Sequence, residues 1–360
     1  MPTQHIARPE WLGRRDEAIL EPGRPICDAH HHLWNRPNNR YLAEDFAVDL
    51  ASGHNIVSTV FVECESAYRS DGIESLRPVG ETEFAVRESE RATATHASST
   101  TIAAGIIGFV DLRLGAEVEH IVSAHEQAGR GRFRGIRHCV AADADNRVPT
   151  HRKQPPLGLL ADDSFLEGFA CLAPFGASFE AWAYHPQLPE LLELARAFPE
   201  TTIVLNHVGG PVSIGPYADN RATVLDQWRN SISALAQCPN VYVKLGGFGI
   251  SIHGFAWETL EKPPSSETVA DATGAFIHHC IDCFGIERAL FESNFPVDKV
   301  SYSYAILWNA FKRVAARYST SEQDALFHDN AIRLYRLNER TDGRDENIRW
   351  PAKTRGNRPN

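Results

Sequence analysis

The sequence lacks several features that would place it in common functional classes. It contains no run of about 18 or more apolar residues, so no hydrophobic membrane-spanning helix is expected. Residues 1–23 carry no apolar segment of the kind found in a secretory signal, which favours a cytoplasmic protein. Acidic residues outnumber basic ones by 46 to 36, and the net charge of −10 argues against nucleic acid as the main partner.

Cysteine pairs and nucleotide-binding glycines are also missing. The seven cysteines are odd in number and scattered, and only Cys280 and Cys283 form a C-x-x-C motif, with no second pair to complete a zinc site. Reduced thiols in the cytosol are the simpler interpretation. No G-x-G-x-x-G motif follows a predicted strand, which argues against a dinucleotide-binding fold.

The sequence does contain a regular alternation of short apolar or β-branched runs with helical patterns. Such alternation predicts βα units and a parallel sheet, and eight runs fit a closed barrel better than an open sheet. The predicted strands are 25–32, 56–65, 102–112, 133–140, 178–184, 202–209, 241–247 and 289–296. Helical patterns between and after them include 186–198, 221–237, 272–285, 304–318 and 321–337.

We therefore predict an α/β fold with a single (β/α)8 barrel, a TIM barrel, over residues 25–337 of the 360-residue chain. An N-terminal arm, 1–24, precedes this domain and a polar tail, 338–360, follows it. The polar, proline-rich segment 141–157 comes directly after a predicted strand. We expect it to form a long loop at the active-site end of the barrel, where βα loops gather.

Three consecutive histidines end the first predicted strand, in the run Asp28-Ala29-His30-His31-His32. Residues two apart on a strand face the same side, so His30 and His32 project together and His31 points the other way. Each buried imidazole needs a hydrogen-bond partner, which makes three in a row improbable as core filler. The spacing places two imidazoles on one side of a metal ion or of a bound carbonyl group.

Two later strands also end in polar residues. The strand at 202–209 leads into Asn206-His207-Val208-Gly209-Gly210-Pro211, which displays His207 where barrel enzymes carry catalytic side chains. The strand at 289–296 brings Glu292 and Asn294 to one face by the same period of two. A buried carboxylate is costly unless it is paired or ligating, so Glu292 is either catalytic or paired with a buried base such as Lys244 or Arg137.

Further polar and aromatic residues fall at the ends of the remaining strands. Each is a weak signal alone, but together they form a ring around one barrel mouth that packing does not explain. Arg137 and His185 are candidates for catalysis. The candidates for substrate binding are Glu63, His138, Trp182, Tyr184 and Lys244.

These motifs resemble one known family. D-x-H-H-H on strand 1, N-H-V-G-G-P on strand 6, S-N-F-P on strand 8 and F-H-D-N-A-I-R-L-Y at 327–335 are similar to the amidohydrolase superfamily. They resemble most its amidohydrolase-related branch, which includes sugar lactonases and 2-pyrone-4,6-dicarboxylate lactonase. The resemblance runs from about residue 25 to residue 337.

The resemblance implies that His30, His32 and His207 occupy positions that ligate a divalent ion, commonly zinc, in metal-using members. In the family, the corresponding position near the end of the last predicted strand, 289–296, is usually an aspartate that ligates the metal and takes a proton from the attacking water. Here it is Asn294, whose amide cannot accept that proton and is a poor zinc ligand. The family also contains lactonases that work without metal, so both a metal-bound and a metal-free enzyme stay open.

We expect a hydrolase that opens a lactone or a similarly activated cyclic ester or amide in small-molecule catabolism. His30, His32 and Arg137 would polarise the carbonyl, and the base would be His207, His185 or Glu292. Arg137 and Lys244 favour a carboxylate-bearing substrate. The alternatives are a decarboxylase or hydratase of an aromatic-derived acid on the same barrel, and a small-molecule binding protein without catalysis. Neither nucleic acid nor membrane is an expected partner, and the sequence allows a homo-oligomer without specifying one.

Overall fold

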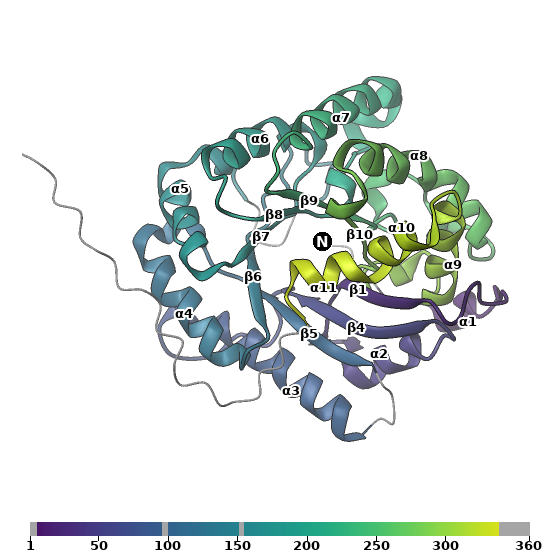
Figure 1. The fold of residues 1–360 in the computed structure, drawn as a ribbon, viewed down its shortest axis with the longest axis horizontal. Helices are drawn as coiled ribbons and strands as arrows, with labels where there is room; N and C mark the ends of the chain where they lie inside the picture. The colour runs from purple at the N-terminus through teal and green to yellow at the C-terminus, as the bar shows by residue number, and fades with distance from the viewer. Residues whose placement is uncertain (1–5, 96–99, 151–154, 338–360) are drawn as a thin grey trace, which may run out of the picture.

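The computed structural model describes residues 6–95, 100–150 and 155–337, and eight parallel strands form the centre of the molecule (Figure 1). Neighbouring strands pair in sequence order around the sheet. They are β1 (Pro25–His31), β4 (Asn55–Val62), β5 (Thr101–Gly108), β6 (Phe133–Arg137), β7 (Ser178–Ala181), β8 (Ile203–Leu205), β9 (Val241–Leu245) and β10 (Ala289–Phe291). The predicted TIM barrel is thus confirmed.

The barrel closes just beyond the end of β10. His31 and Phe295 form a parallel bridge, and His32 N donates to the Phe295 carbonyl at 2.7 Å. The buried Asp28 carboxylate reinforces this junction, because it accepts from the backbone N–H of Ser293 at 2.9 Å and from its hydroxyl at 2.6 Å. The first and last strands are therefore joined at the level of the predicted site residues.

Helices cover the outside of the barrel (Figure 1). Leucines at helical spacing in α6 show why: Leu188, Leu191 and Leu194 are all buried, while the opposite face is polar. The outer helices are α2 (Ala43–Leu50), α3 (Val79–Thr95), α4 (Val118–Gly129), α5 (Asp163–Ala170), α6 (Leu188–Ala197), α7 (Arg221–Leu235), α8 (Ser266–Phe284) and α9 (Tyr304–Ala315). Within the described ranges, no helix combines the length and the apolar character needed to cross a bilayer.

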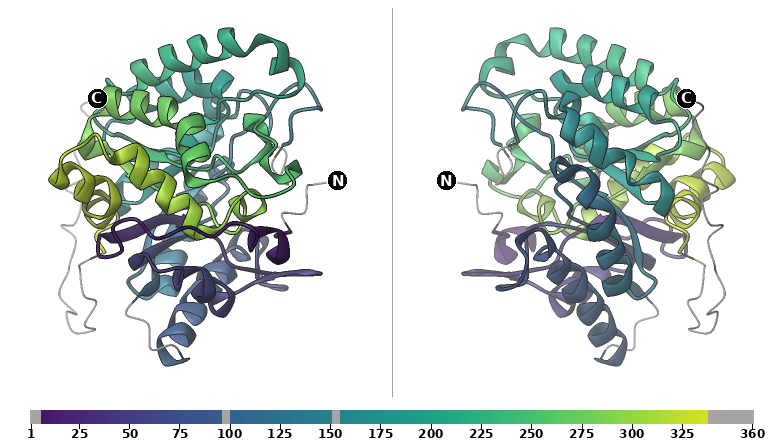
Figure 2. Two further views of the ribbon diagram at one scale, coloured as in Figure 1. Left: turned by 90° about the vertical axis from the view of Figure 1, so that its right-hand side faces the viewer. Right: turned by 90° about the vertical axis from the view of Figure 1, so that its left-hand side faces the viewer.

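The predicted helix 321–337 is interrupted. It consists of α10 (Thr320–Asp324), a π-helical turn (Ala325–Asp329) and α11 (Asn330–Leu334). Its final residues close the N-terminal end of the barrel, where Tyr335 is fully buried among inward-facing side chains such as Cys27 and Leu290. The side views show these C-terminal helices at one end of the barrel (Figure 2).

The structure describes residues 6–24 of the N-terminal arm, which include α1 (Pro9–Leu12). Trp11 Nε1 donates to the Leu260 carbonyl at 2.9 Å, and Leu20 N donates to Asn309 Oδ1, also at 2.9 Å. The arm is therefore fastened to the barrel at both ends. The polar tail 338–360 lies outside the described residues.

The strands are shorter than predicted, and their missing ends carry the site. The strand predicted at 202–209 ends at Leu205, and the one predicted at 289–296 ends at Phe291. Residues His207, Val208 and Asn294 have φ values of 52°, 49° and 54°, a left-handed conformation outside the extended range of a regular strand. Such strain in non-glycine residues is held in place only by the surrounding structure and is frequent at functional sites.

Candidate active site

A cavity of about 880 Å³ opens at the C-terminal end of the strands. Six of the predicted site residues line it, namely His32, Arg137, Trp182, Tyr184, His207 and Asn294. Much of the predicted loop 141–157 also lines it, from Ala142 to Thr150 except Asp145, and again at Pro155 and Leu157. The prediction that this loop lies at the active-site end is confirmed for its described residues.

The histidine pair of β1 has the geometry that the strand period predicted. The Nε2 atoms of His30 and His32 lie 3.2 Å apart. His31 faces the other way, where its Nε2 bonds the Thr59 hydroxyl at 2.9 Å and its ring stacks on Phe46. Only His30 and His32 therefore point toward the barrel mouth.

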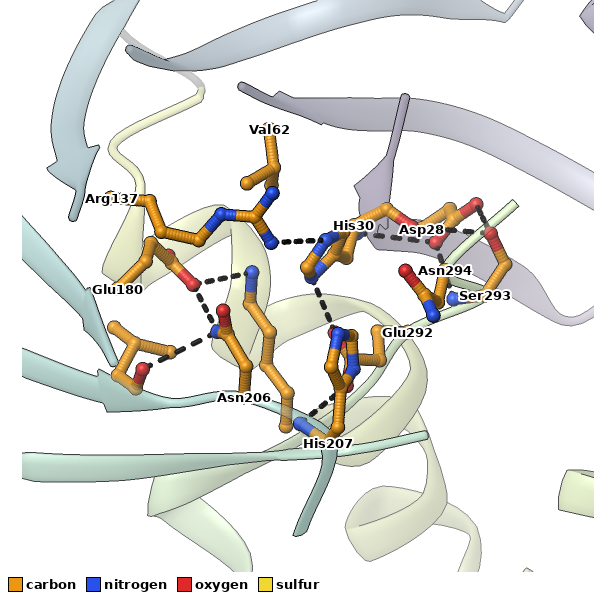
Figure 3. Close-up of polar contacts among 12 residues, drawn as sticks. Asp28, His30, Val62, Arg137, Glu180, Asn206, His207, Glu292, Ser293 and Asn294 are labelled. Atoms are coloured by element: carbon orange, nitrogen blue, oxygen red, sulfur yellow. Dashed lines mark hydrogen bonds and ion pairs between the residues drawn. The ribbon is translucent and has the colours of Figure 1, made fainter. Parts of the chain in front are cut away.

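Glu292 lies between two histidines from opposite parts of the barrel (Figure 3). One carboxylate oxygen is 2.7 Å from His30 Nδ1, and the other is 2.7 Å from His207 Nδ1. The backbone N–H of His207 also donates to Glu292 at 2.9 Å. One fully buried carboxylate thus orients both imidazoles.

These contacts fix which ring nitrogens carry protons. A carboxylate or carbonyl oxygen can only accept, so His30 and His207 carry their protons on Nδ1, facing Glu292. His32 Nδ1 lies 2.7 Å from the Val62 carbonyl and is protonated for the same reason. In the neutral form of each ring, the lone pair is then on Nε2. Burial holds the pKa of His30 and of His32 well below the usual range, which keeps both imidazoles neutral.

A glycine-rich turn after β9 makes room for this arrangement. A Cβ at Gly246 would collide with Glu292, and a Cβ at Gly247 would collide with the ring of His207. Gly247 also has a φ of 73°, which side chains rarely adopt. Gly246 and Gly247 were predicted as the end of the strand 241–247, but β9 ends at Leu245 and the two glycines allow the close approach of the two site residues.

Two other buried bases have their own carboxylates. Arg137 Nε donates to Glu63 at 2.7 Å, and Lys244 Nζ lies 2.8 Å from Glu180. The alternative that Glu292 pairs with Lys244 or Arg137 is therefore wrong. Arg137 still reaches the cavity, with Nη1 at 3.4 Å from His30 Nε2.

The structure does not bring every predicted residue to the cavity. Of the residues that it describes, the cavity wall does not include Glu63, His138, His185, Lys244 or Glu292, nor the buried His30. His138 follows Arg137 and so faces the opposite side, where its ring packs against Phe109 and Phe165. His185 Nδ1 accepts from the backbone N–H of Val212 at 3.2 Å.

Aromatic residues form the side walls. The ring of Trp182 meets His207 edge-on, with 4.7 Å between the ring centroids. The Tyr184 hydroxyl donates to the Pro149 carbonyl and so fastens the long loop. These two side chains shape the cavity and hold its outer wall.

Sequence reasoning missed a short hairpin at the rim, made of β2 (Trp34–Arg36) and β3 (Asn39–Tyr41). Trp34 and Arg36 both line the cavity, and the Arg36 guanidinium lies 4.2 Å above the Trp34 ring. The signal was present as Pro-Asn-Asn between two aromatic strands, which is typical of a tight turn.

The donor set fits a divalent ion. Two Nε2 lone pairs that face each other at 3.2 Å repel unless a cation or a donor lies between them. Two ligands about 2.1 Å from a tetrahedral zinc ion are separated by roughly 3.4 Å, close to the observed distance. Ligand atoms of His30, His207 and Glu292 also lie within 4.8 Å of one another. Imidazole-rich sites of this kind suit zinc.

The comparisons with known proteins agree with the fold. A family model described as amidohydrolase matches residues 27–337. An uncharacterised protein, y4mH, of Sinorhizobium fredii is 33% identical over 334 residues, which cover 87% of this chain and 98% of that protein. An L-fucono-1,5-lactonase of Burkholderia multivorans is 24% identical over 326 residues, covering 88% of this chain and 98% of the lactonase.

A solved structure shares the fold. It is an amidohydrolase from Burkholderia multivorans with bound zinc, which matches with a TM-score of 0.67 at 23% identity. The match covers 87% of this chain and 99% of that chain.

Proposed function

We propose that this chain, which belongs to the amidohydrolase family, hydrolyses the ring ester of a lactone. One observation carries the proposal: Glu292 holds His207 by Nδ1 at 2.7 Å, and His207 lines the cavity with its Nε2 lone pair available. A carboxylate that fixes the tautomer of a histidine is the arrangement of a general base. The similarity to L-fucono-1,5-lactonase supports a lactone as the substrate.

The reaction uses His207 twice. Its Nε2 takes a proton from a water molecule as the water oxygen bonds to the ring carbonyl carbon. The same proton then passes to the ring oxygen when its bond to that carbon breaks, which leaves an open hydroxy acid. Arg137, which lines the cavity, stabilises the negative charge that develops on the carbonyl oxygen.

A divalent ion, with zinc as the first choice, would be held by the Nε2 atoms of His30 and His32. When bound, such an ion polarises a carbonyl or lowers the pKa of a water molecule. His207 is kept as the base in this proposal because Asn294 cannot take a proton and Glu292 does not line the described cavity wall.

The substrate we propose is a carboxylate-bearing lactone of small-molecule catabolism in the cytoplasm. Among the described residues, Arg36, Arg137 and Arg147 line the cavity together with one acidic residue, Asp143. Arg137 also pairs with Glu63, and Arg147 with Asp145, and neither carboxylate lines the cavity. This excess of guanidinium groups supports an anionic substrate, although Lys244 contributes nothing to it. None of the seven cysteines forms a disulfide in the structure, which agrees with a reducing compartment.

The test is acid release from a panel of five- and six-membered lactones, each with and without a carboxylate. We expect turnover that favours the carboxylated members. His207→Asn keeps a donor to Glu292 but removes Nε2, so kcat should fall by about 10²–10⁴-fold. His120→Asn, the same change at an exposed helical position, is the matched control and should leave kcat unchanged.

Two outcomes would change the proposal. Release of CO2 from aromatic acids, without opening of any lactone, would favour the decarboxylase alternative. Metal analysis of the same preparations tests the proposed ion. Stoichiometric zinc in protein purified without added ions supports the His30–His32 site. Full activity in ion-free protein would contradict that site.

A further inference from the structure

Asp298 lies next to Asn294 and does not itself line the cavity. It begins a 3₁₀ turn (Asp298–Val300) that follows strand β10. Its side chain is fully buried and accepts three hydrogen bonds. Asn294 Nδ2 donates to one carboxylate oxygen at 2.8 Å. Gly249 N and the Tyr302 hydroxyl both donate to the other oxygen at 2.7 Å. Burial raises the pKa of Asp298 to about 6, so the group is ionised at neutral pH.

This carboxylate decides which end of the Asn294 amide faces the cavity. An amide has a donor end and an acceptor end of nearly equal size, whereas a carboxylate only accepts. Asp298 therefore selects Nδ2 of Asn294, and the amide oxygen is left for the cavity that Asn294 lines. The main chain of Asn294 is fixed as well, because its N–H donates to the His30 carbonyl at 2.9 Å.

The glycine-rich turn after β9 supports Asp298 in the same way as the other site residues. A Cβ at Gly249 would lie 2.7 Å from both Cβ and Cγ of Asp298. Gly246 and Gly247 make the equivalent room for Glu292 and His207. One turn is thus shaped to bring three polar groups close together.

We infer that Asp298 is a positioning residue that makes Asn294 present a hydrogen-bond acceptor to the hydrolytic water. This inference rests on the proposed function. The water would donate one proton toward His207 Nε2 and the other to Asn294 Oδ1, so that a lone pair faces the carbonyl carbon. An aspartate at position 294 would carry a negative charge beside the cavity. In this chain, the charge is carried four residues later, by Asp298, which contacts Asn294.

The experiment exchanges the two side chains. In Asp298→Asn, the new amide oxygen satisfies Gly249 N and Tyr302, so its NH₂ group faces residue 294. Asn294 then inverts and offers a donor to the cavity. In the double variant Asn294→Asp with Asp298→Asn, the direction of the hydrogen bond is reversed: the new carboxylate at position 294 accepts from the new amide at position 298. Residue 294 then offers an oxygen to the cavity, as in the wild-type protein. Asn294→Asp alone places two carboxylates about 2.8 Å apart, which disfavours their joint ionisation.

We expect Asp298→Asn to lower kcat by about tenfold or more, with a smaller change in KM, and the double variant to recover most of it. The melting temperature should fall by roughly 2–4 °C in each single variant and recover in the double variant. Tyr302→Phe is the control, because it removes a donor to the other carboxylate oxygen of Asp298. Its melting temperature should also be lower, and adding Asn294→Asp should not restore it.

The result that overturns the inference is a double variant that is as slow as Asp298→Asn, or a coupling in melting temperature without any effect on kcat. The thermal cycle needs no substrate. If the wild-type protein opens no lactone but residues 294 and 298 still rescue each other thermally, the pairing stands and the proposed function is at fault.

Discussion

Two of the fully buried carboxylates, Glu292 and Glu180, lie toward different ends of the barrel interior and have different neighbours. Glu292, near the cavity, lies between the Nδ1 atoms of His30 and His207. Glu180, near the end that Tyr335 closes, accepts from the Tyr335 hydroxyl at 2.6 Å and contacts Lys244 Nζ at 2.8 Å. Both carboxylates are fully buried and both have polar partners on more than one element.

The two carboxylates differ in whether a partner side chain has a second polar atom that reaches the cavity. Lysine and tyrosine end at the atom that contacts Glu180. A third partner, Asn206, donates from Nδ2 at 2.5 Å, but it is fully buried and does not line the cavity, so this group of contacts stops inside the protein. Imidazole has a second nitrogen, so the contacts of Glu292 continue outward and His207 reaches the cavity. Burial and charge alone therefore do not separate Glu292 from Glu180, whereas the second ring nitrogen of His207, on the cavity side, does.

The largest expected effect comes from replacing each carboxylate by its amide. Glu292→Gln puts an NH₂ group against one of two Nδ1–H donors, so one histidine loses its orientation. We expect kcat for the best lactone to fall about 10²–10⁴-fold, which is about 3–5 kcal/mol of activation free energy. Glu180→Gln is the matched substitution at the other end. Equal losses of kcat in the two variants would contradict the comparison.

The sequence predicted the cavity end of the barrel better than the end that Tyr335 closes. The period of two along a strand correctly placed His30 and His32 together and His31 apart. It also made Lys244 a candidate for the rim, because the period gives the side that a residue faces but not its depth. Lys244 pairs in register with Leu290, inside β9 and β10, and so lies below the rim.

Other features were beyond reach for different reasons. Glu63 was recognised as a polar strand end, but its pairing with Arg137 joins residues 74 apart in the chain, which no local pattern reveals. Asp298 follows the motif Ser293-Asn294-Phe295-Pro296, beyond β10, and lies in a 3₁₀ turn to which the strand period does not apply. Asn294 was recognised as a departure from the family, yet its orientation depends on that unseen neighbour.

A second prediction tests the structural end directly. Lys244→Met leaves Glu180 buried without its cation, and breaking a buried pair in this way costs about 3–5 kcal/mol of unfolding free energy. Urea denaturation should show this loss as a lower midpoint with an unchanged slope. Adding Glu180→Leu removes the uncompensated charge and should restore much of the stability. A double variant no more stable than Lys244→Met would mean that the pair does not act as a unit.

The smallest expected effect concerns the Tyr335 hydroxyl, which joins the C-terminal helix to Glu180. Tyr335→Phe keeps a ring beside Lys244 Nζ, now 5.5 Å from the ring centroid, and removes one hydrogen bond to a charged group. Such a bond contributes about 1.5–3 kcal/mol, so the urea midpoint should fall by less than in Lys244→Met. In a Glu180→Gln background the same change should cost less, because the acceptor is no longer charged. A larger loss of kcat than of stability in Tyr335→Phe would show that this end of the barrel communicates with the cavity, and the two ends could then no longer be treated as separate.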